Sequence, residues 1–181
     1  RELDVIDATA RGGFTLTLLL AFVFAAISET RQSTTVAVAT TVLGAAWIGL
    51  GLGFLILVRD LEPDGRLVLI TVLLTVFVAD TFAYLGGRLA GRHKLAPGIS
   101  PGKTWEGLAA GVAGGVLTTW LALNGEPIAV DGWEAFTLGG VIVLAAVAGD
   151  LFESMVKRDL GVKDSGRVLM GHGGVLDRVD S

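Results

Sequence analysis

The sequence predicts an all-α fold, a polytopic transmembrane helix bundle of about five spans with a cytoplasm-facing polar cavity. Three observations predict it. Of the 181 residues, 52% are hydrophobic, and the mean hydropathy is +0.68. Only 18% are charged, whereas a soluble domain carries about a quarter. The charged residues cluster between long apolar runs, which is typical of a membrane protein.

Five apolar stretches account for the predicted spans: residues 14–28, 36–58, 67–89, 105–123 and 135–152. A transmembrane helix needs roughly 20 apolar residues. The first stretch is short for a span, and the second is long enough to cross a bilayer. The fourth has glycines three or four residues apart, which gives one smooth face and predicts close helix packing. These glycines are Gly107, Gly111, Gly114 and Gly115.

The connections between the stretches alternate in charge. The acidic set comprises residues 1–11, 59–66 and 124–134. The basic set comprises Arg31, residues 88–103 and residues 157–178, and it holds ten of the 14 lysines and arginines. The positive-inside rule therefore predicts a multi-pass protein of the cell (inner or plasma) membrane, with the basic connections in the cytoplasm.

Composition also restricts the chemistry. The 181 residues contain no cysteine, which excludes disulfides, thiolate metal sites and a cysteine nucleophile within them. The two histidines, His93 and His172, do not favour a multi-histidine zinc site. We expect any metal to be held by carboxylate oxygens, which favours Mg²⁺, Mn²⁺ or Ca²⁺.

Acidic residues lie within the third and the fifth predicted spans. Asp80 falls in the third, where a carboxylate costs at least ~2.5 kcal/mol by insertion scales and is usually functional. A helix–helix hydrogen bond or an ion pair is the alternative. Asp150, Glu153, Ser154 and Lys157 are spaced to share one face of the fifth helix. They indicate either a site or a solvated helix end whose basic residues reach lipid headgroups.

A glycine-rich turn, residues 171–174, follows the last span. Such a turn leading into a helix offers free backbone N–H groups to phosphate, and Gly173 and Gly174 allow close approach of the backbone. Asp177 and Asp180, three residues apart, would share a face and suit Mg²⁺ bound with a substrate phosphate. Positive charge for phosphate oxygens comes from Lys157, Arg158, Lys163 and Arg178.

His172 has three interpretations: a general base, a fixed hydrogen-bond donor to phosphate, or a structural contact in the turn. The basic loop at residues 89–104 has two interpretations: it can lie on anionic lipid, or it can form a second phosphate-binding arm. Ser100 or Thr104 is expected to cap the helix after this loop, and Lys103 is expected to pair locally with Glu106.

Residues 149–181 closely resemble the signature motif of the phosphatidate cytidylyltransferase family, also called CDP-diacylglycerol synthases. The residues that fill this motif in register are Ser154, Lys157, Arg158, Lys163, Asp164, His172, Gly173, Gly174, Asp177, Arg178 and Asp180. Residues 79–84 and 99–107 are similar to two further polar segments of the family. Met170 stands where the family usually has proline. Because family members usually continue beyond this point and carry extra N-terminal spans, we expect the chain to be part of a longer protein.

The resemblance implies transfer of a cytidylyl group from CTP to phosphatidic acid, giving CDP-diacylglycerol and pyrophosphate. The implied cofactor is Mg²⁺ or Mn²⁺, with a second cation left open. The partners are CTP, phosphatidic acid and membrane lipid, with no nucleic-acid polymer, and the expected assembly is a homodimer. We expect N-terminal spans at residues 1–66 and a catalytic membrane region at residues 67–181, with cytoplasmic loops at residues 88–104 and 154–178.

Roles follow from the resemblance. Asp150 and Asp177 are the expected primary metal ligands, supplemented by Glu153 and Asp180. The expected catalytic residues are Asp150, Lys157, Arg158, Lys163, Asp164, His172, Asp177 and Arg178. The expected substrate-binding residues are Ser100, Lys103, Ser154, Gly173 and Gly174. Two other functions remain open: a CTP-dependent polyprenol- or dolichol-type lipid kinase, and a membrane transporter.

Overall fold

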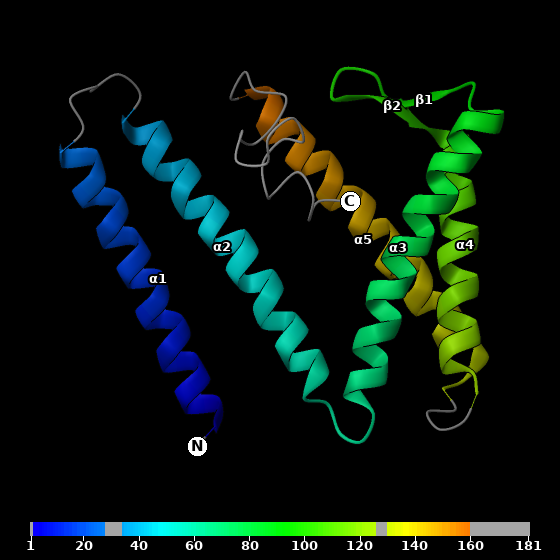
Figure 1. The fold of residues 1–181 in the computed structure, drawn as a ribbon, viewed down its shortest axis with the longest axis horizontal. Helices are drawn as coiled ribbons and strands as arrows, with labels where there is room; N and C mark the ends of the chain where they lie inside the picture. The colour runs from blue at the N-terminus through cyan, green and yellow to red at the C-terminus, as the bar shows by residue number, and fades with distance from the viewer. Residues whose placement is uncertain (1, 28–33, 126–129, 160–181) are drawn as a thin grey trace, which may run out of the picture. The chain divides into compact units, whose positions relative to one another are not determined.

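The computed structural model describes residues 2–27, 34–125 and 130–159. Its elements, in chain order, are α1 (Glu2–Ile27), α2 (Thr34–Arg59), α3 (Gly65–Ala90), β1 (Lys94–Ala96), β2 (Ser100–Thr104), α4 (Trp105–Leu123) and α5 (Gly132–Asp159) (Figure 1). The described chain is thus helical except for one short hairpin and the connections.

Four of the described helices are long and apolar enough to cross a membrane: Val38–Arg59 within α2, and α3, α4 and α5 over their whole lengths. The apolar part of α1, Gly12–Ile27, is shorter. The described residues of all five predicted stretches are therefore helical. Residues 2–11, expected as an acidic connection, are also helical. A helix that has been nucleated propagates readily through residues such as Leu3, Ala8 and Ala10, which favour helix.

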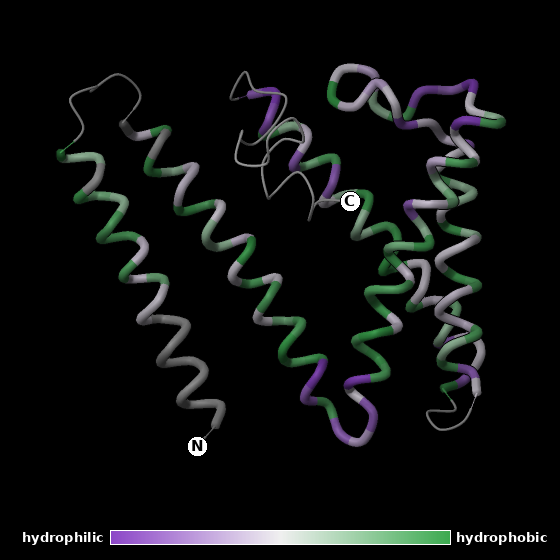
Figure 2. The backbone as a smooth tube through the Cα atoms, in the orientation of Figure 1, coloured by the Kyte–Doolittle hydropathy of each residue, from purple (hydrophilic) through white to green (hydrophobic). Residues whose placement is uncertain are grey.

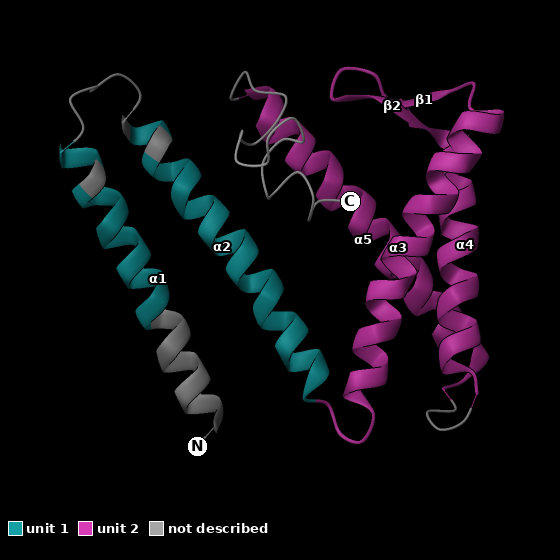
Figure 3. Ribbon diagram, viewed as in Figure 1, with its two compact units in different colours: residues 1–60 teal, residues 61–181 magenta. Residues whose placement is uncertain are grey.

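The chain divides into two compact units, residues 1–60 and residues 61–181 (Figure 3). The first contains α1 and α2. The second contains α3, the hairpin, α4 and α5, and it carries every described residue that was predicted to form the site. Figure 2 shows the hydrophilic residues of this second unit mostly at the ends of its helices and in the hairpin, with apolar residues between them.

Glycines bring α3 and α4 together, as the sequence predicted. Gly107 and Gly111 are buried. A Cβ atom would lie 2.6 Å from the Ala83 carbonyl oxygen at Gly107, and 2.9 Å from that of Ala79 at Gly111. Only glycine allows the two backbones to lie this close. The contact fixes the end of α3 beside the start of α4.

Helix α5 packs on α4 in the same way. A Cβ atom at Gly139 would lie 2.8 Å from Val116 Cα. Between α3 and α4, the buried hydroxyl oxygens of Thr75 and Thr119 are 2.8 Å apart and hydrogen-bonded. The outward residues are large and apolar, as a lipid-facing surface requires; Phe77, for example, is 67% exposed. The three helices of the second unit therefore form one packed group.

The connection between α3 and α4 is an antiparallel hairpin rather than an irregular loop. Lys94 pairs with Thr104 and Ala96 with Ser100. The sequence did not predict these strands, because its prolines and glycines indicate turns. The hairpin lies at the same end of the second unit as the end of α5 (Figure 1).

Candidate active site

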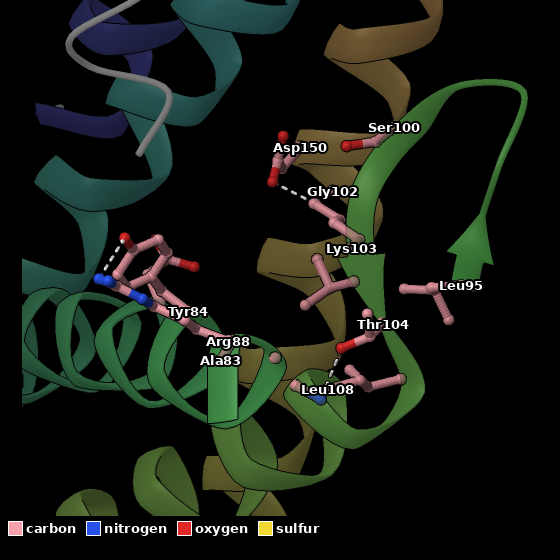
Figure 4. A pocket seen from close by; sticks show the side chains of 14 residues that line it. Ala83, Tyr84, Arg88, Leu95, Ser100, Gly102, Lys103, Thr104, Leu108 and Asp150 are labelled. Carbon is pink, nitrogen blue, oxygen red and sulfur yellow. Dashed lines mark hydrogen bonds and ion pairs between the residues drawn. The ribbon is translucent and has the colours of Figure 1, made fainter. Parts of the chain in front are cut away.

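A cavity of about 410 Å³ lies at this end of the second unit, among α3, the hairpin, α4 and α5. Figure 4 shows its main side chains. Its lining includes four charged residues and several small or apolar ones. The charged residues are Asp80 and Arg88 from α3, Lys103 from β2 and Asp150 from α5.

The hairpin is fixed at its base by Thr104 and Glu106. Thr104 has extended backbone angles and its hydroxyl accepts a hydrogen bond of 3.1 Å from Gly107 N, which starts α4. Glu106 accepts hydrogen bonds from the backbone N–H groups of Arg92 and His93, and its Oε1 lies 2.6 Å from His93 Nδ1. One carboxylate in the first turn of α4 thus holds the segment that leads from α3 into β1.

Lys103 forms an ion pair with Asp150, and this contact joins the hairpin to α5 (Figure 4). The side chains are 24% and 38% exposed, so the pair is half-buried in the cavity wall. The predicted local pair of Lys103 with Glu106 is wrong. Lys103 is on β2 and is directed into the cavity, whereas Glu106 is in the first turn of α4 and binds the base of the hairpin.

The last turns of α5 make two further contacts. Glu153 is buried and its Oε1 lies 2.8 Å from Lys157 Nζ. Arg158 Nε donates a long hydrogen bond of 3.5 Å to the carbonyl oxygen of Ile99 in the hairpin. The Arg158 contact places the end of α5 beside the hairpin. Ser154 is partly exposed and is not in the cavity lining.

The cavity brings together five residues that the sequence singled out: Asp80, Ser100, Lys103, Thr104 and Asp150. It also includes Tyr84 and Arg88, to which the sequence analysis gave no role. Asp80, Tyr84 and Arg88 are spaced i, i+4 and i+8 and therefore lie along one face of α3. This spacing from an intramembrane acid was the signal that would have identified them.

The rest of the predicted site lies outside the described residues: Lys163, Asp164, His172, Gly173, Gly174, Asp177, Arg178 and Asp180. Within the described part of the chain, no group of three or more His, Asp or Glu side chains is placed to hold a metal ion. Of the four predicted metal ligands, this part contains Asp150 and Glu153, and each contacts a lysine. The described residues therefore do not by themselves form a metal site.

The cavity suits a phosphorylated ligand. Lysine and arginine provide charged donors, and serine and tyrosine provide hydroxyl donors, all of which bind phosphate oxygens. Partial burial strengthens such contacts relative to bulk water.

Fold and site together define a multi-pass membrane protein with a polar, charged site at one end of its helices. A sequence model of the cytidylyltransferase family matches residues 3–181. The chain belongs to this family.

Several curated relatives are phosphatidate cytidylyltransferases. Those of Brucella abortus (strain 9-941), Mycobacterium leprae and Pseudomonas aeruginosa are 45%, 42% and 39% identical to the chain. The matches cover 76%, 77% and 76% of the chain, and 53%, 44% and 54% of the respective relatives. The chain thus spans about half the length of the curated relatives it matches.

Proposed function

We propose that the protein containing this chain transfers a cytidylyl group from CTP to phosphatidic acid, giving CDP-diacylglycerol and pyrophosphate in phospholipid synthesis. The observation that carries the proposal is the cavity with the Lys103–Asp150 pair at the ends of membrane helices, in a chain of the cytidylyltransferase family. Relatives from three genera that carry the name phosphatidate cytidylyltransferase support it.

The reaction joins two anions. A phosphate oxygen of phosphatidic acid attacks the α-phosphorus of CTP, and the bond from that phosphorus to the oxygen bridging the α- and β-phosphates breaks. Pyrophosphate leaves with the electron pair. Charge on the pentacoordinate phosphorus must be stabilised. The donors that we assign to phosphate oxygens are Ser100 and Lys103 from the hairpin and Lys157, Arg158, Lys163 and Arg178 from the motif. Of these, Lys163 and Arg178 lie outside the described residues.

A divalent cation, Mg²⁺ or Mn²⁺, is part of the proposal, and a second cation remains open. Such an ion neutralises phosphate oxygens. Asp150 is one of the two described carboxylates that line the cavity, the other being Asp80. We assign the cation to Asp150 with Asp177 as its proposed partner, and Glu153 and Asp180 as additional ligands. Chelation with EDTA is expected to abolish turnover, and Mg²⁺ is expected to restore it.

The proposed location is the inner or plasma membrane, with the cavity on the cytoplasmic side, where CTP is available. The charge distribution supports this orientation, since Arg88, Arg92, Lys94 and Lys103 all lie around the hairpin. A homodimer is the proposed assembly, and its test is the mass of the detergent-solubilised protein.

The deciding experiment uses CTP labelled at either the α- or the γ-phosphate, with phosphatidic acid in mixed micelles. A cytidylyltransferase places the α-label in lipid and releases the γ-label as pyrophosphate. A CTP-dependent lipid kinase would place the γ-label in lipid. Lipid that carries only the γ-label, or turnover that does not depend on CTP, would contradict the proposal.

A further inference from the structure

We infer that Arg88, with Tyr84 beside it, binds the phosphate of the lipid substrate and selects for a phosphomonoester headgroup. The inference rests on the proposed function and adds a residue that determines specificity for lipid. Both side chains come from α3 and line the cavity. Figure 4 shows them together, apart from Asp150 and Ser100.

The first argument is charge. Four charged residues line the cavity. Two of them, Lys103 and Asp150, neutralise each other in an ion pair. Among the residues that the structure describes, the only polar partner of the Arg88 guanidinium is the Tyr84 phenol, at 3.5 Å. The fourth charged residue, Asp80, lies two helical turns from Arg88 on the same face of α3. Among the described residues no ion pair to the Arg88 guanidinium is found, so its charge can bind an anion that enters the cavity.

The second argument is hydrogen-bonding capacity. A guanidinium has five N–H donors in a planar fork, which matches the oxygens of a phosphate. Arg88 uses one of its two terminal nitrogens for Tyr84, where Nη1 donates to the phenol oxygen. The phenol keeps its own O–H group as a donor. The two side chains together can bind more than one oxygen of the same phosphate.

The third argument is the position of Arg88 along the membrane helix. Arg88 lies in the last turn of α3, a helix long enough to cross the membrane. Next to the pair, the outward side chains of α3 are apolar, with Leu85 46% and Leu89 85% exposed. Tyrosine and arginine near the end of a membrane helix lie at the level of lipid headgroups. This position favours the phosphate of a lipid over that of a nucleotide.

The test measures kinetics in mixed micelles, with phosphatidic acid and CTP varied separately. Arg88→Gln is expected to raise KM for phosphatidic acid about 10- to 100-fold, because the substitution removes one or two charge-assisted hydrogen bonds to the phosphate. KM for CTP should change less than about twofold. Arg88→Lys should retain part of the affinity, because lysine keeps the charge but not the fork.

Arg92→Gln is the matched control. Arg92 is four residues further along, is exposed, and does not line the cavity. Arg92→Gln removes one positive charge, as Arg88→Gln does, and therefore lowers the positive surface potential in the same way. An equal loss in both variants would mean that Arg88 only attracts anionic lipid to the surface, and would overturn the inference. A rise in KM for CTP alone would assign Arg88 to the nucleotide and would also overturn it.

A binding measurement separates this inference from the proposed function. Radiolabelled phosphatidic acid is bound to the full-length protein without CTP and competed with diacylglycerol, phosphatidylglycerol or phosphatidic acid. Only phosphatidic acid should compete strongly, and Arg88→Gln should lose this preference. If wild-type protein forms no CDP-diacylglycerol, the proposed function fails while this result still stands. If the Arg88→Gln variant does not fold, Tyr84→Phe replaces it in the test. We expect Tyr84→Phe to lose a few-fold in affinity for phosphatidic acid.

Discussion

Lys103 and Asp150 connect two parts of the second unit that are far apart in sequence. One side chain comes from the hairpin and the other from α5, and their ion pair lies in the cavity wall. Half-burial makes such a pair sensitive to the loss of either partner, because the remaining charge is left partly desolvated. The pair therefore both positions the hairpin and determines the charge that a ligand meets.

The pair predicts how substitutions combine. Lys103→Met and Asp150→Asn are each expected to lower kcat/KM for CTP by about 100-fold or more. The double variant should lose less than the product of the two losses, because each single change already breaks the pair. Steady-state kinetics of the three variants check this. CTP-dependent turnover that survives Asp150→Asn would remove Asp150 from the site, and strictly multiplicative losses would mean that the residues act independently.

Sequence reasoning found most polar residues of the described site but not their partners. It identified Lys103, yet assigned it to Glu106, three residues away, because local spacing is all that a single sequence displays. The true partner, Asp150, is brought close only by the packing of α5 on α4. Arg88 was assigned only to a basic connection, although its i, i+8 spacing from Asp80 places it on the same face of α3 and distinguishes it from Arg92, which follows the end of that helix.

At the scale of elements, the helices were predictable and the hairpin was not. Apolar length predicted where the helices lie, and in α4 the predicted stretch of residues 105–123 is the observed Trp105–Leu123. It did not predict the polar extensions, since α1 begins at Glu2 and α5 continues to Asp159. The strands β1 and β2 are three and five residues long. The two strands are held in place by Glu106 and by contacts with α5. Neither kind of contact produces a periodic pattern in the sequence.

Adjacent glycines in α5 provide a test of the packing. A Cβ atom at Gly139 would lie 2.8 Å from Val116 Cα, whereas at Gly140 nothing lies within 4 Å. Gly139→Ala is therefore expected to destabilise the helix group by about 1–3 kcal/mol through overpacking. Gly140→Ala should be neutral or slightly stabilising, since alanine favours helix. Thermal unfolding in detergent measures the stability of both variants. Equal changes in stability would contradict the packing of α5 on α4 through the face that carries Gly139.

At the scale of the whole molecule, alternating charge predicted which connections share an end. The hairpin and the end of α5 do meet, through Arg158 and Ile99 and through Lys103 and Asp150. The connection that follows α4 at Asn124 lies at the other end of that helix. This arrangement fits a membrane protein with a basic end and an acidic end.

Cysteine labelling tests the orientation. The 181 residues contain no cysteine, so Gly98→Cys in the hairpin and Gly125→Cys after α4 each add one thiol to this part of the protein, and the protein without either substitution gives the background labelling. Both glycines have open space around them. In intact cells, a membrane-impermeant maleimide should label the cysteine at position 125 and not that at position 98. Permeabilised cells, where both should react, are the control. The reverse pattern would place the cavity outside.

The Lys103–Asp150 contact also has a consequence for how ligands load. An anion that binds Lys103 draws it away from Asp150, whose carboxylate then attracts a cation more strongly. If the proposed cation binds at Asp150, it would likewise release Lys103 for an anion. The two binding equilibria are thermodynamically linked, and linkage is reciprocal: each ligand must raise the affinity for the other by the same factor. No fixed order of arrival is needed for the cavity to favour the state in which both are present.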